Sequence, residues 1–248
     1  MMQAATGLSR IAKHHAMLRQ TAQAQPTPNP EPDVPANEMI EIDTHAMIGK
    51  GLHRECFVHP EDSNLCVKIV VAGNSDENRR EANYYARLDR RGVSWEMLPR
   101  FHGLVQTNLG EGAIFDLVRD YDGPVSHTLA HYLASKRLTA EHATVLRTSL
   151  ANLKSYLLQN RIITMTLKPK NILFQQYAAG EGRLVIVDNI GNSDFIPLAN
   201  HSKWLARRKI QRKWRRFEAN LRSAYRSNSN LGQLLNDPVG AAVGRGGS

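Results

Sequence analysis

The spacing of apolar residues changes along this chain, and the change divides it into two parts. As far as about residue 122, apolar residues alternate with polar ones or cluster in short β-branched runs between turn residues, as in RECFVHP and LCVKIVVA. That pattern is typical of strands. From about Leu129 onwards the apolar residues recur at helical spacing, as in TAEHATVLRTSLANLKSYLLQN. The sequence therefore predicts a strand-rich first part and a helical second part.

The individual elements are predicted in a definite order. Five strands are expected in MIEIDTHAMIGKG, RECFVHP, LCVKIVVA, RFHGLVQT and GAIFDLVRDYDG. One helix, ENRREANYYARLDRRG, lies between the third and the fourth strand, and Gly92 is a natural C-cap for it. Two further helices are expected in HTLAHYLASK and TAEHATVLRTSLANLKSYLLQN, then a small hairpin formed by NRIITMTLKPKNILF and GRLVIVDNIG. The last predicted helix is HSKWLARRKIQRKWRRFEANL.

Both ends of the chain are expected to lie outside the folded body. Residues 1–38 run into QAQPTPNPEPDVPAN, whose prolines block helices and sheet ladders, so they are predicted to form a disordered Pro-rich extension. Residues 227–248 end in GAAVGRGGS and are predicted to form a flexible Gly-rich tail. The domain is thus placed at residues 39–226, with a strand-rich lobe at about 39–122 and a helical lobe at about 123–226.

Composition narrows the class of protein. Hydrophobic residues make up 42% and charged residues 22% of the 248 residues, as in globular proteins generally. The sequence has neither an apolar run of about 18 residues nor an apolar signal region near its N-terminus, so a cytoplasmic protein is expected. Cys56 and Cys66 fall on adjacent predicted strands. A disulfide would fit that arrangement, but without an export signal two reduced thiols are favoured.

The net charge of +9 favours anionic partners, and much of the positive charge lies in the last predicted helix. An apolar stripe along that helix is expected to pack on the helical part; it comprises Ala206, Ile210, Trp214, Phe217 and Leu221. The basic face carries the residues expected to meet a partner, namely Arg207, Arg208, Arg212 and Arg216. Either these charges are simply solvated, or they bind nucleic acid, an anionic membrane surface or an acidic protein.

Residues of the strand-rich part suit a nucleotide. Gly49 and Gly51 lie in a loop between two strands, where backbone amides would approach phosphates; a tight hairpin turn explains the same glycines. Lys68 lies in the middle of the apolar strand CVKIV, where a buried ammonium needs an anion. Glu81, 13 residues later, is a candidate partner that orients Lys68. The alternatives are a Lys on the solvent face of an edge strand and an ordinary exposed helical Glu.

The strongest motif is TMTLKPKNILF followed by VIVDNIG. Protein kinases carry H-R-D-x-K-x-x-N and then D-F-G at this place, and Lys168, Asn171 and Asp188 match. Asn171 and Asp188 would bind Mg²⁺ from the two arms of the hairpin, because this cation takes oxygen ligands. The order of elements and motifs predicts an α+β, compact, protein-kinase-like two-lobe fold. Its first lobe has an antiparallel sheet with one helix and its second lobe is reduced and helical. ATP and Mg are the predicted cofactors.

The catalytic side of this motif departs from a working kinase. Thr166 stands at the position of the usual catalytic Asp, and a hydroxyl is no carboxylate base near neutral pH. Thr166 and Lys168 are the residues left to orient an acceptor. The stretch from Asp188 to Gly191 has one extra residue before its glycine, and few residues follow for an activation segment. Nucleotide binding is therefore favoured over phosphorylation of peptides.

With these motifs in place, the chain resembles the YrbL family, the PhoP regulatory network proteins of Gram-negative bacteria. The resemblance covers about residues 39–217 and rests on GKGLHRECFVHPEDSNLCVKIV, RREANYYARL, PRFHG, LKSYLLQNRIITMTLKPKNIL and DNIGNSDFIPLANHSKW. It implies a kinase-like fold, a bacterial cytoplasmic protein and a link to the regulon of the PhoP response regulator. The expected function is ATP and Mg²⁺ binding by a weak or non-standard phosphotransferase or a regulatory pseudokinase. The alternative is a non-enzymatic module that binds an anionic partner through its basic helix.

Overall fold

The computed structural model describes residues 39–51, 53–72, 76–191 and 203–235, which all belong to one unit of the chain, Met39–Ser248. The expectation for residues 1–38 lies outside the described residues. No helix in the described ranges is long and apolar enough to cross a membrane.

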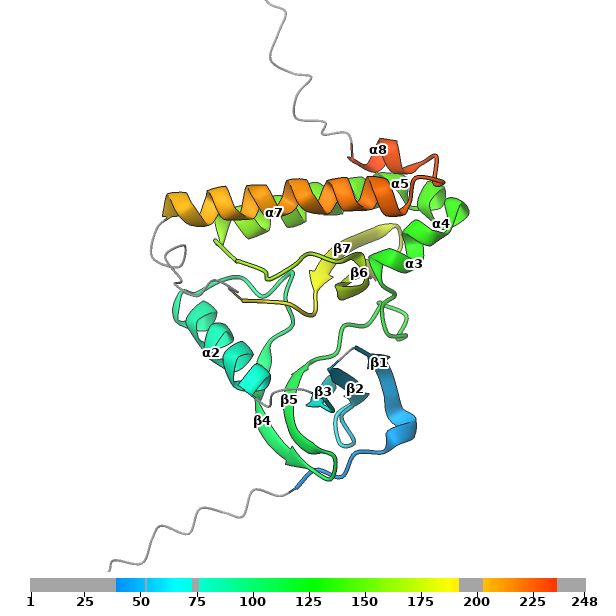
Figure 1. The fold of residues 1–248 in the computed structure, drawn as a ribbon. Helices are drawn as coiled ribbons and strands as arrows, with labels where there is room; N and C mark the ends of the chain where they lie inside the picture. The colour runs from blue at the N-terminus through cyan, green and yellow to red at the C-terminus, as the bar shows by residue number, and fades with distance from the viewer. Residues whose placement is uncertain (1–38, 52, 73–75, 192–202, 236–248) are drawn as a thin grey trace, which may run out of the picture. The chain divides into compact units, whose positions relative to one another are not determined.

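The first part of this unit is a five-stranded antiparallel sheet with the strand order β1-β2-β3-β5-β4 (Figure 1). Its strands are β1 (Met47–Lys50), β2 (Arg54–Val58), β3 (Leu65–Val70), β4 (Phe101–Thr107) and β5 (Gly110–Asp116). Helix α2 (Asp76–Arg90) connects β3 to β4, and the chain leaves it through Gly92 at φ +61°. The five predicted strands, the helix between the third and fourth of them, and the glycine that ends this helix are confirmed.

The first strand is shorter than predicted. A 3-10 turn, η1 (Thr44–Ala46), interrupts the segment MIEIDTHAMIGKG, and the Asp43 side chain caps the turn by accepting from the backbone amide of His45. Upstream of that turn, Ile40 donates its amide to the carbonyl of Gln106, 2.9 Å away, and runs beside the end of β4. The Asx-type cap competes with the sheet ladder for the backbone, which is why the strand begins only at Met47.

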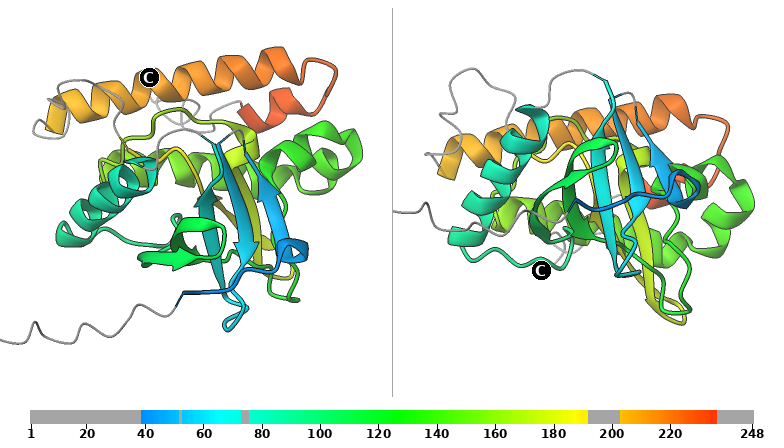
Figure 2. Two further views of the ribbon diagram at one scale, coloured as in Figure 1. Left: turned by 60° about the horizontal axis from the view of Figure 1, so that its bottom comes forward. Right: turned by 90° about the horizontal axis from the view of Figure 1, so that it is seen from below.

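The two faces of the sheet bury different sets of side chains. One face is covered by the segment before β1, and its buried cluster consists of Ile42, Phe57, Val67, Ile69 and Val105. The other face, which includes Cys66, Ala113 and Phe115, joins the main hydrophobic core together with α2 and the helical part. Figure 2 shows α2 alongside β4 and β5. The candidate site described below lies on the face of the sheet that joins the main core.

The second part contains helices and one hairpin. Its elements are α3 (Leu129–Ala134), α4 (Lys136–Glu141), α5 (Ala143–Gln159), η2 (Pro169–Asn171), β6 (Ile172–Ala178), β7 (Glu181–Ile186), α7 (Lys203–Ala224) and α8 (Leu231–Leu235). β6 and β7 pair as the predicted antiparallel hairpin. The single helix predicted from Thr139 is wrong, because the helix breaks at His142, whose φ of −102° and ψ of 14° are not helical.

The folded chain extends beyond the boundary predicted at residue 226. Asn228 is buried and donates through Nδ2 to the carbonyl of Leu133 and to Oγ1 of Thr139, both 2.8 Å away. Leu231 and Leu234 of α8 are buried in the main core. The expected tail therefore begins later than residue 227, since side chains just before the glycine-rich end find partners on α3 and α4. Residues 236–248 lie outside the described residues.

Helix α7 packs as its apolar stripe predicts. The five residues of that stripe, Ala206, Ile210, Trp214, Phe217 and Leu221, are all buried in the main core. In Figure 1, α7 and α5 lie at the opposite end of this unit from the five-stranded sheet, with the β6–β7 hairpin between them. The packing leaves the arginines of α7 in contact with solvent.

Candidate functional site

Strand alternation places the side chains of Arg54, Cys56 and Lys68 on one face of the sheet. Cys56 of β2 lies opposite Lys68 of β3, and Arg54 lies opposite Val70, so Arg54, Cys56 and Lys68 share a face. This face also carries Phe115 and belongs to the main core. The alternation of β2 and β3 therefore brings two cations, Arg54 and Lys68, toward α2 and the end of β7.

Lys68 is buried, as its apolar strand predicts, with 8% of its surface exposed. Its ammonium donates to the backbone carbonyl of Val187 and lies over the ring of Phe115, 4.0 Å from the ring centroid. No carboxylate pairs with Lys68 among the described residues. The prediction of a buried Lys is confirmed, and the alternative of a Lys on a solvent-facing edge is excluded.

Glu81 is also buried, but its ionic partner differs from the predicted one. It lies on the inward face of α2 with Asn78, Tyr85 and Leu88, at helical spacing. One oxygen, Oε2, accepts from the guanidinium of Arg54 instead of from Lys68. The expected Lys68–Glu81 pair is therefore not formed in this structure, because Glu81 pairs with Arg54 and Lys68 donates to the carbonyl of Val187.

Asn171 and Asp188 meet at the base of the β6–β7 hairpin, as the motif predicts. Asn171 ends η2 and Asp188 follows β7, and the amide of Val187 donates to the carbonyl of Asn171 at 3.0 Å. The Asn171 side-chain amide lies 3.4 Å from Oδ2 of Asp188. The other carboxylate oxygen, Oδ1, accepts from Arg54. The structure thus brings together the side chains predicted to bind a metal and adds an arginine to them.

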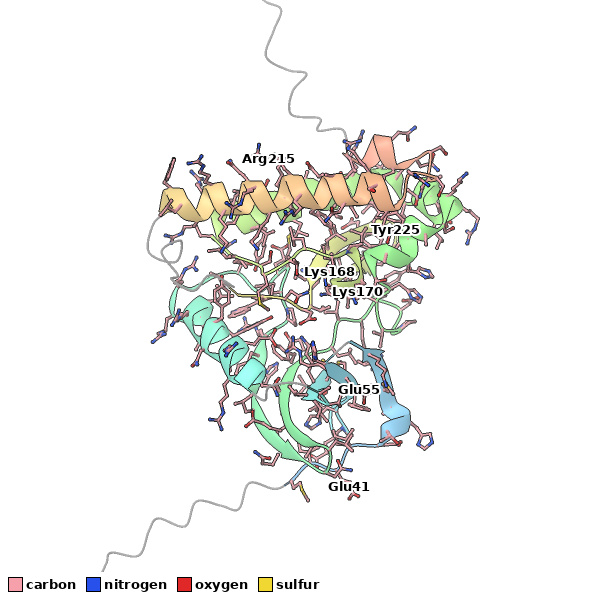
Figure 3. All side chains as sticks on the ribbon, viewed as in Figure 1. Glu41, Glu55, Lys168, Lys170, Arg215 and Tyr225 are labelled. Carbon is pink, nitrogen blue, oxygen red and sulfur yellow. The ribbon has the colours of Figure 1, made fainter. Side chains whose placement is uncertain are left out.

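The residues at the predicted catalytic position lie next to this group in the chain. Thr166 and Lys168 are both exposed, and Figure 3 shows Lys168 on the segment that precedes η2. The segment is held from two sides, because Met165 donates its amide to the carbonyl of Asn189 at 2.7 Å and accepts from Lys213 of α7. Thr166 offers a hydroxyl and Lys168 an ammonium, and neither is a carboxylate base.

The glycine loop between β1 and β2 is a tight hairpin. Gly51 donates its amide to the carbonyl of Arg54 at 2.7 Å, and a Cβ at Gly51 would lie 3.1 Å from that oxygen. Gly49 lies opposite Cys56 in the ladder, and both glycines are exposed. The hairpin interpretation accounts for Gly51, while an approach of these amides to phosphates remains a prediction. Residue 52 lies outside the described residues.

Two buried polar atoms near Asp188 lack a hydrogen-bond partner in the described part of the chain. They are Oε1 of Glu81 and the hydroxyl of Tyr85. Burial, and then the negative charges of Glu81 and Asp188, raise the pKa of the Tyr85 hydroxyl well above its usual value. Such buried polar atoms are costly when left unpaired.

Cys56 and Cys66 carry free thiols, and the Cys66 thiol donates to the carbonyl of Asp116 at 3.9 Å. The neighbouring Cys66 thiol lowers the pKa of Cys56, whereas the Cys56 thiol, together with burial, raises the pKa of Cys66 well above its usual value. The favoured interpretation of two reduced, partly buried thiols therefore agrees with this structure.

Arg54 and Tyr85 are the members of the site that sequence reasoning did not identify. Arg54 stands where a third glycine of a phosphate loop would lie, and that position alone says nothing of its partners. A signal was present in the strand alternation, because Arg54, Cys56 and Lys68 follow from one ladder register. Tyr85 lies one helical turn after Glu81 and shares its face.

Asp188 and Asn171 are the described residues that could hold a cation, and they would be few ligands for one. The described residues contain no group of three or more His, Cys, Asp or Glu side chains that would hold a metal by themselves. Asp188 with Asn171 supplies two oxygen-bearing side chains, and Mg²⁺ commonly binds one or two such groups while phosphates and water complete its shell. Lys68 supplies a buried positive charge beside them.

Comparison with known proteins agrees with the resemblance seen in the motifs. The model of a family described as PhoP regulatory network protein YrbL matches residues 40–222. Relatives named "Uncharacterized protein YrbL" from Escherichia coli (strain K12) and Shigella flexneri are each 45% identical over 184 residues, covering 73% of this chain and 87% of the relative. The chain therefore belongs to the family of the PhoP regulatory network protein YrbL.

Proposed function

We propose that this chain binds a nucleoside triphosphate, ATP, together with Mg²⁺ on a protein-kinase-like two-lobe scaffold. The observation that carries the proposal is the buried ammonium of Lys68, which has a carbonyl and an aromatic ring as partners and no carboxylate among the described residues. A buried cation of this kind needs an anion. The α- and β-phosphates of a nucleotide would supply it, while Asn171 and Asp188 would hold the metal.

Each predicted residue has a separate role in this proposal. Bound Mg²⁺ would neutralise charge on the phosphates, and Asp188 and Asn171 would fix its position. Lys68 would hold the phosphates from the sheet side, and Gly49 and Gly51 would let the backbone of the β1–β2 hairpin approach them with no side chain in the way. Glu81 would anchor the guanidinium of Arg54, which also contacts Asp188. Thr166 and Lys168 would face the acceptor.

The proposed activity is binding first and phosphoryl transfer second. Thr166 lacks the carboxylate of a general base, which typically contributes about 10²–10⁴-fold to rate. Positioning and electrostatics account for most of the catalysis in phosphoryl transfer, so a slow reaction remains compatible with the site. The function is therefore that of a regulatory pseudokinase or a weak phosphotransferase.

Calorimetric titration of the full chain with ATP and Mg²⁺ tests the proposal. We expect Lys68→Met to weaken binding by at least about tenfold, the size of one lost charge-assisted hydrogen bond. Asp188→Asn should remove the Mg²⁺ dependence. Lys136→Met, at an exposed position of α4, is the matched control and should bind as the wild type does. Absence of wild-type binding at millimolar nucleotide, or equal binding by Lys68→Met, would reject the proposal.

A second candidate function is capture of an anionic partner by α7, and exposure of its basic face favours it. Arg207, Arg208, Arg212 and Arg216 are all exposed. Trp204 is 63% exposed, and the guanidinium of Arg208 lies 5.3 Å from its ring centroid. An exposed aromatic ring beside arginines suits stacking on bases, so nucleic acid is favoured over a membrane surface or an acidic protein.

A further inference from the structure

Arg54 holds two carboxylates from different parts of the chain at once. One terminal nitrogen, Nη1, donates to Oε2 of Glu81 on α2, and the other, Nη2, donates to Oδ1 of Asp188 after β7. Exposed fractions are 15% for the Arg54 side chain, 6% for Glu81 and 36% for Asp188. The guanidinium is thus a largely buried bridge between the sheet, the helix and the hairpin.

This bridge occupies the carboxylate that the proposed cation needs. Oδ1 of Asp188 accepts from Arg54, and Oδ2 faces Asn171, so both oxygens are engaged. A guanidinium and a divalent cation at the same carboxylate repel each other and compensate the same negative charge, so the contact with Arg54 disfavours cation binding at Asp188. Glu81 keeps one oxygen, Oε1, without a partner in the described part of the chain, so it retains an acceptor for a second donor.

We propose that Arg54 is a positioning residue that competes with the divalent cation for Asp188. When metal and phosphate bind, Arg54 gives up its contact with Asp188. The inference rests on the proposed function, since it assigns the regulation of the same site. In the arrangement of this structure, Arg54 bridges Glu81 and Asp188, and Lys68 donates to the carbonyl of Val187. With metal and phosphate bound, the cation contacts the Asp188 carboxylate, while Arg54 keeps its contact with Glu81.

The two-nitrogen geometry of Arg54 is what a lysine cannot reproduce. A planar guanidinium presents a rigid fork that reaches two acceptors, whereas an ammonium acts as a point charge on a flexible stem. Arg54→Lys therefore keeps the positive charge and loses the bridge. Arg54→Met loses both. Comparing the two variants separates competition at Asp188 from a general effect of charge near the metal.

The test is the affinity of the full chain for Mn²⁺ alone, used as a spectroscopic substitute for Mg²⁺. We expect both Arg54→Lys and Arg54→Met to bind Mn²⁺ more tightly than the wild type, by about tenfold, the size of one charge-assisted hydrogen bond. Arg137→Met is the matched control, because Arg137 makes an exposed pair with Glu141 on α4, and its affinity should be unchanged.

The outcomes separate this inference from the proposed function. If only Arg54→Met binds more tightly, charge alone explains the effect and the bridge has no competing role. If neither variant binds Mn²⁺ more tightly while Asp188→Asn no longer binds Mn²⁺, Arg54 does not compete with the cation. That outcome still supports the proposed metal site at Asp188. If Asp188→Asn binds Mn²⁺ and nucleotide as the wild type does, the proposed function itself is wrong. Arg54→Lys decides the question should Arg54→Met fail to fold.

Discussion

Two neighbouring tyrosines on α2 differ by one hydrogen bond. The hydroxyl oxygen of Tyr84 accepts from the backbone amide of Ile163 at 2.9 Å. The hydroxyl of Tyr85 is buried and has no partner among the described residues. A buried donor or acceptor that loses its partner is costly, whereas removal of an unpaired group costs little. The hydroxyl of Tyr84 is therefore expected to stabilise the fold, whereas the hydroxyl of Tyr85 is expected to add no stability or to reduce it.

This difference predicts the effects of removing each hydroxyl. Tyr84→Phe should lower the free energy of unfolding by about 1–2 kcal/mol, because the buried amide of Ile163 loses its acceptor. Tyr85→Phe should leave the free energy unchanged or raise it by up to about 1 kcal/mol. Chemical denaturation of both variants beside the wild type measures these values. Equal losses in the two variants would contradict the hydrogen-bond assignment.

Individual residues of the site were predictable from sequence to different degrees. Lys68 was found because a lysine within an apolar strand demands an anion. Asn171 and Asp188 were found because they match the kinase motifs, and they meet because they lie 17 residues apart on the arms of one hairpin. The partner of Glu81 was not found, since two cations on adjacent strands compete for it and their reach depends on the packing of α2 against the sheet.

Helix α7 is the element in which sequence periodicity was most informative. Its two tryptophans lie on different faces: Trp214 is 2% exposed and belongs to the main core, whereas Trp204 is 63% exposed. Trp214 also donates its indole N–H to Oε1 of Glu218 at 2.6 Å. The same residue type therefore serves packing at one position and faces solvent at the other.

The contrast predicts how much each tryptophan contributes to stability. Trp214→Ala should lower the free energy of unfolding by about 3–5 kcal/mol, because it leaves a cavity under α7. Trp204→Ala should change it by no more than about 0.5 kcal/mol. Urea unfolding followed by circular dichroism compares the two. A large loss in Trp204→Ala would show that this end of α7 is packed and unavailable to a partner.

Element boundaries were less predictable than element types. The five strands, α2, the hairpin and α7 follow from periodicity, but the helix beginning at Thr139 breaks at His142. The sequence there, TAEHATVL, contains no Gly or Pro to mark a break. The α8 region was taken for a tail because the stabilising contacts of Asn228 come from residues near 133 and 139, which no local pattern reveals.

At the scale of the whole molecule, charge is distributed unevenly. The net charge is +9, and the exposed arginines of α7 supply a dense share of the positive surface at the end of the unit away from the sheet (Figure 3, where Arg215 is labelled). Lys209 and Lys213 are different, because Lys209 is buried and Lys213 donates to Met165. The basic face is therefore narrower than the sequence suggests.

This distribution predicts salt-dependent binding of single-stranded nucleic acid. The variant in which Gln replaces Arg207, Arg208, Arg212 and Arg216 should not bind the oligonucleotide even at low salt. Each lost phosphate contact reduces the counterion release that supports binding. Wild-type affinity should fall steeply between about 50 and 200 mM salt. Fluorescence anisotropy with a labelled oligonucleotide measures both. Lys68→Met is the control and should bind as the wild type does; wild-type affinity that is insensitive to salt would exclude this function.

The sequence by itself determined the order of the elements, the burial of Lys68 and the meeting of Asn171 with Asp188, because each depends on periodicity or on a short hairpin. Only the tertiary structure decided which cation pairs with which carboxylate. Arg54 lies 27 residues from Glu81 and 134 from Asp188, and it reaches both because the β2–β3 register, the docking of α2 and the end of β7 converge. Contacts over such separations are fixed by the packing of whole elements, and no local pattern along the chain encodes them.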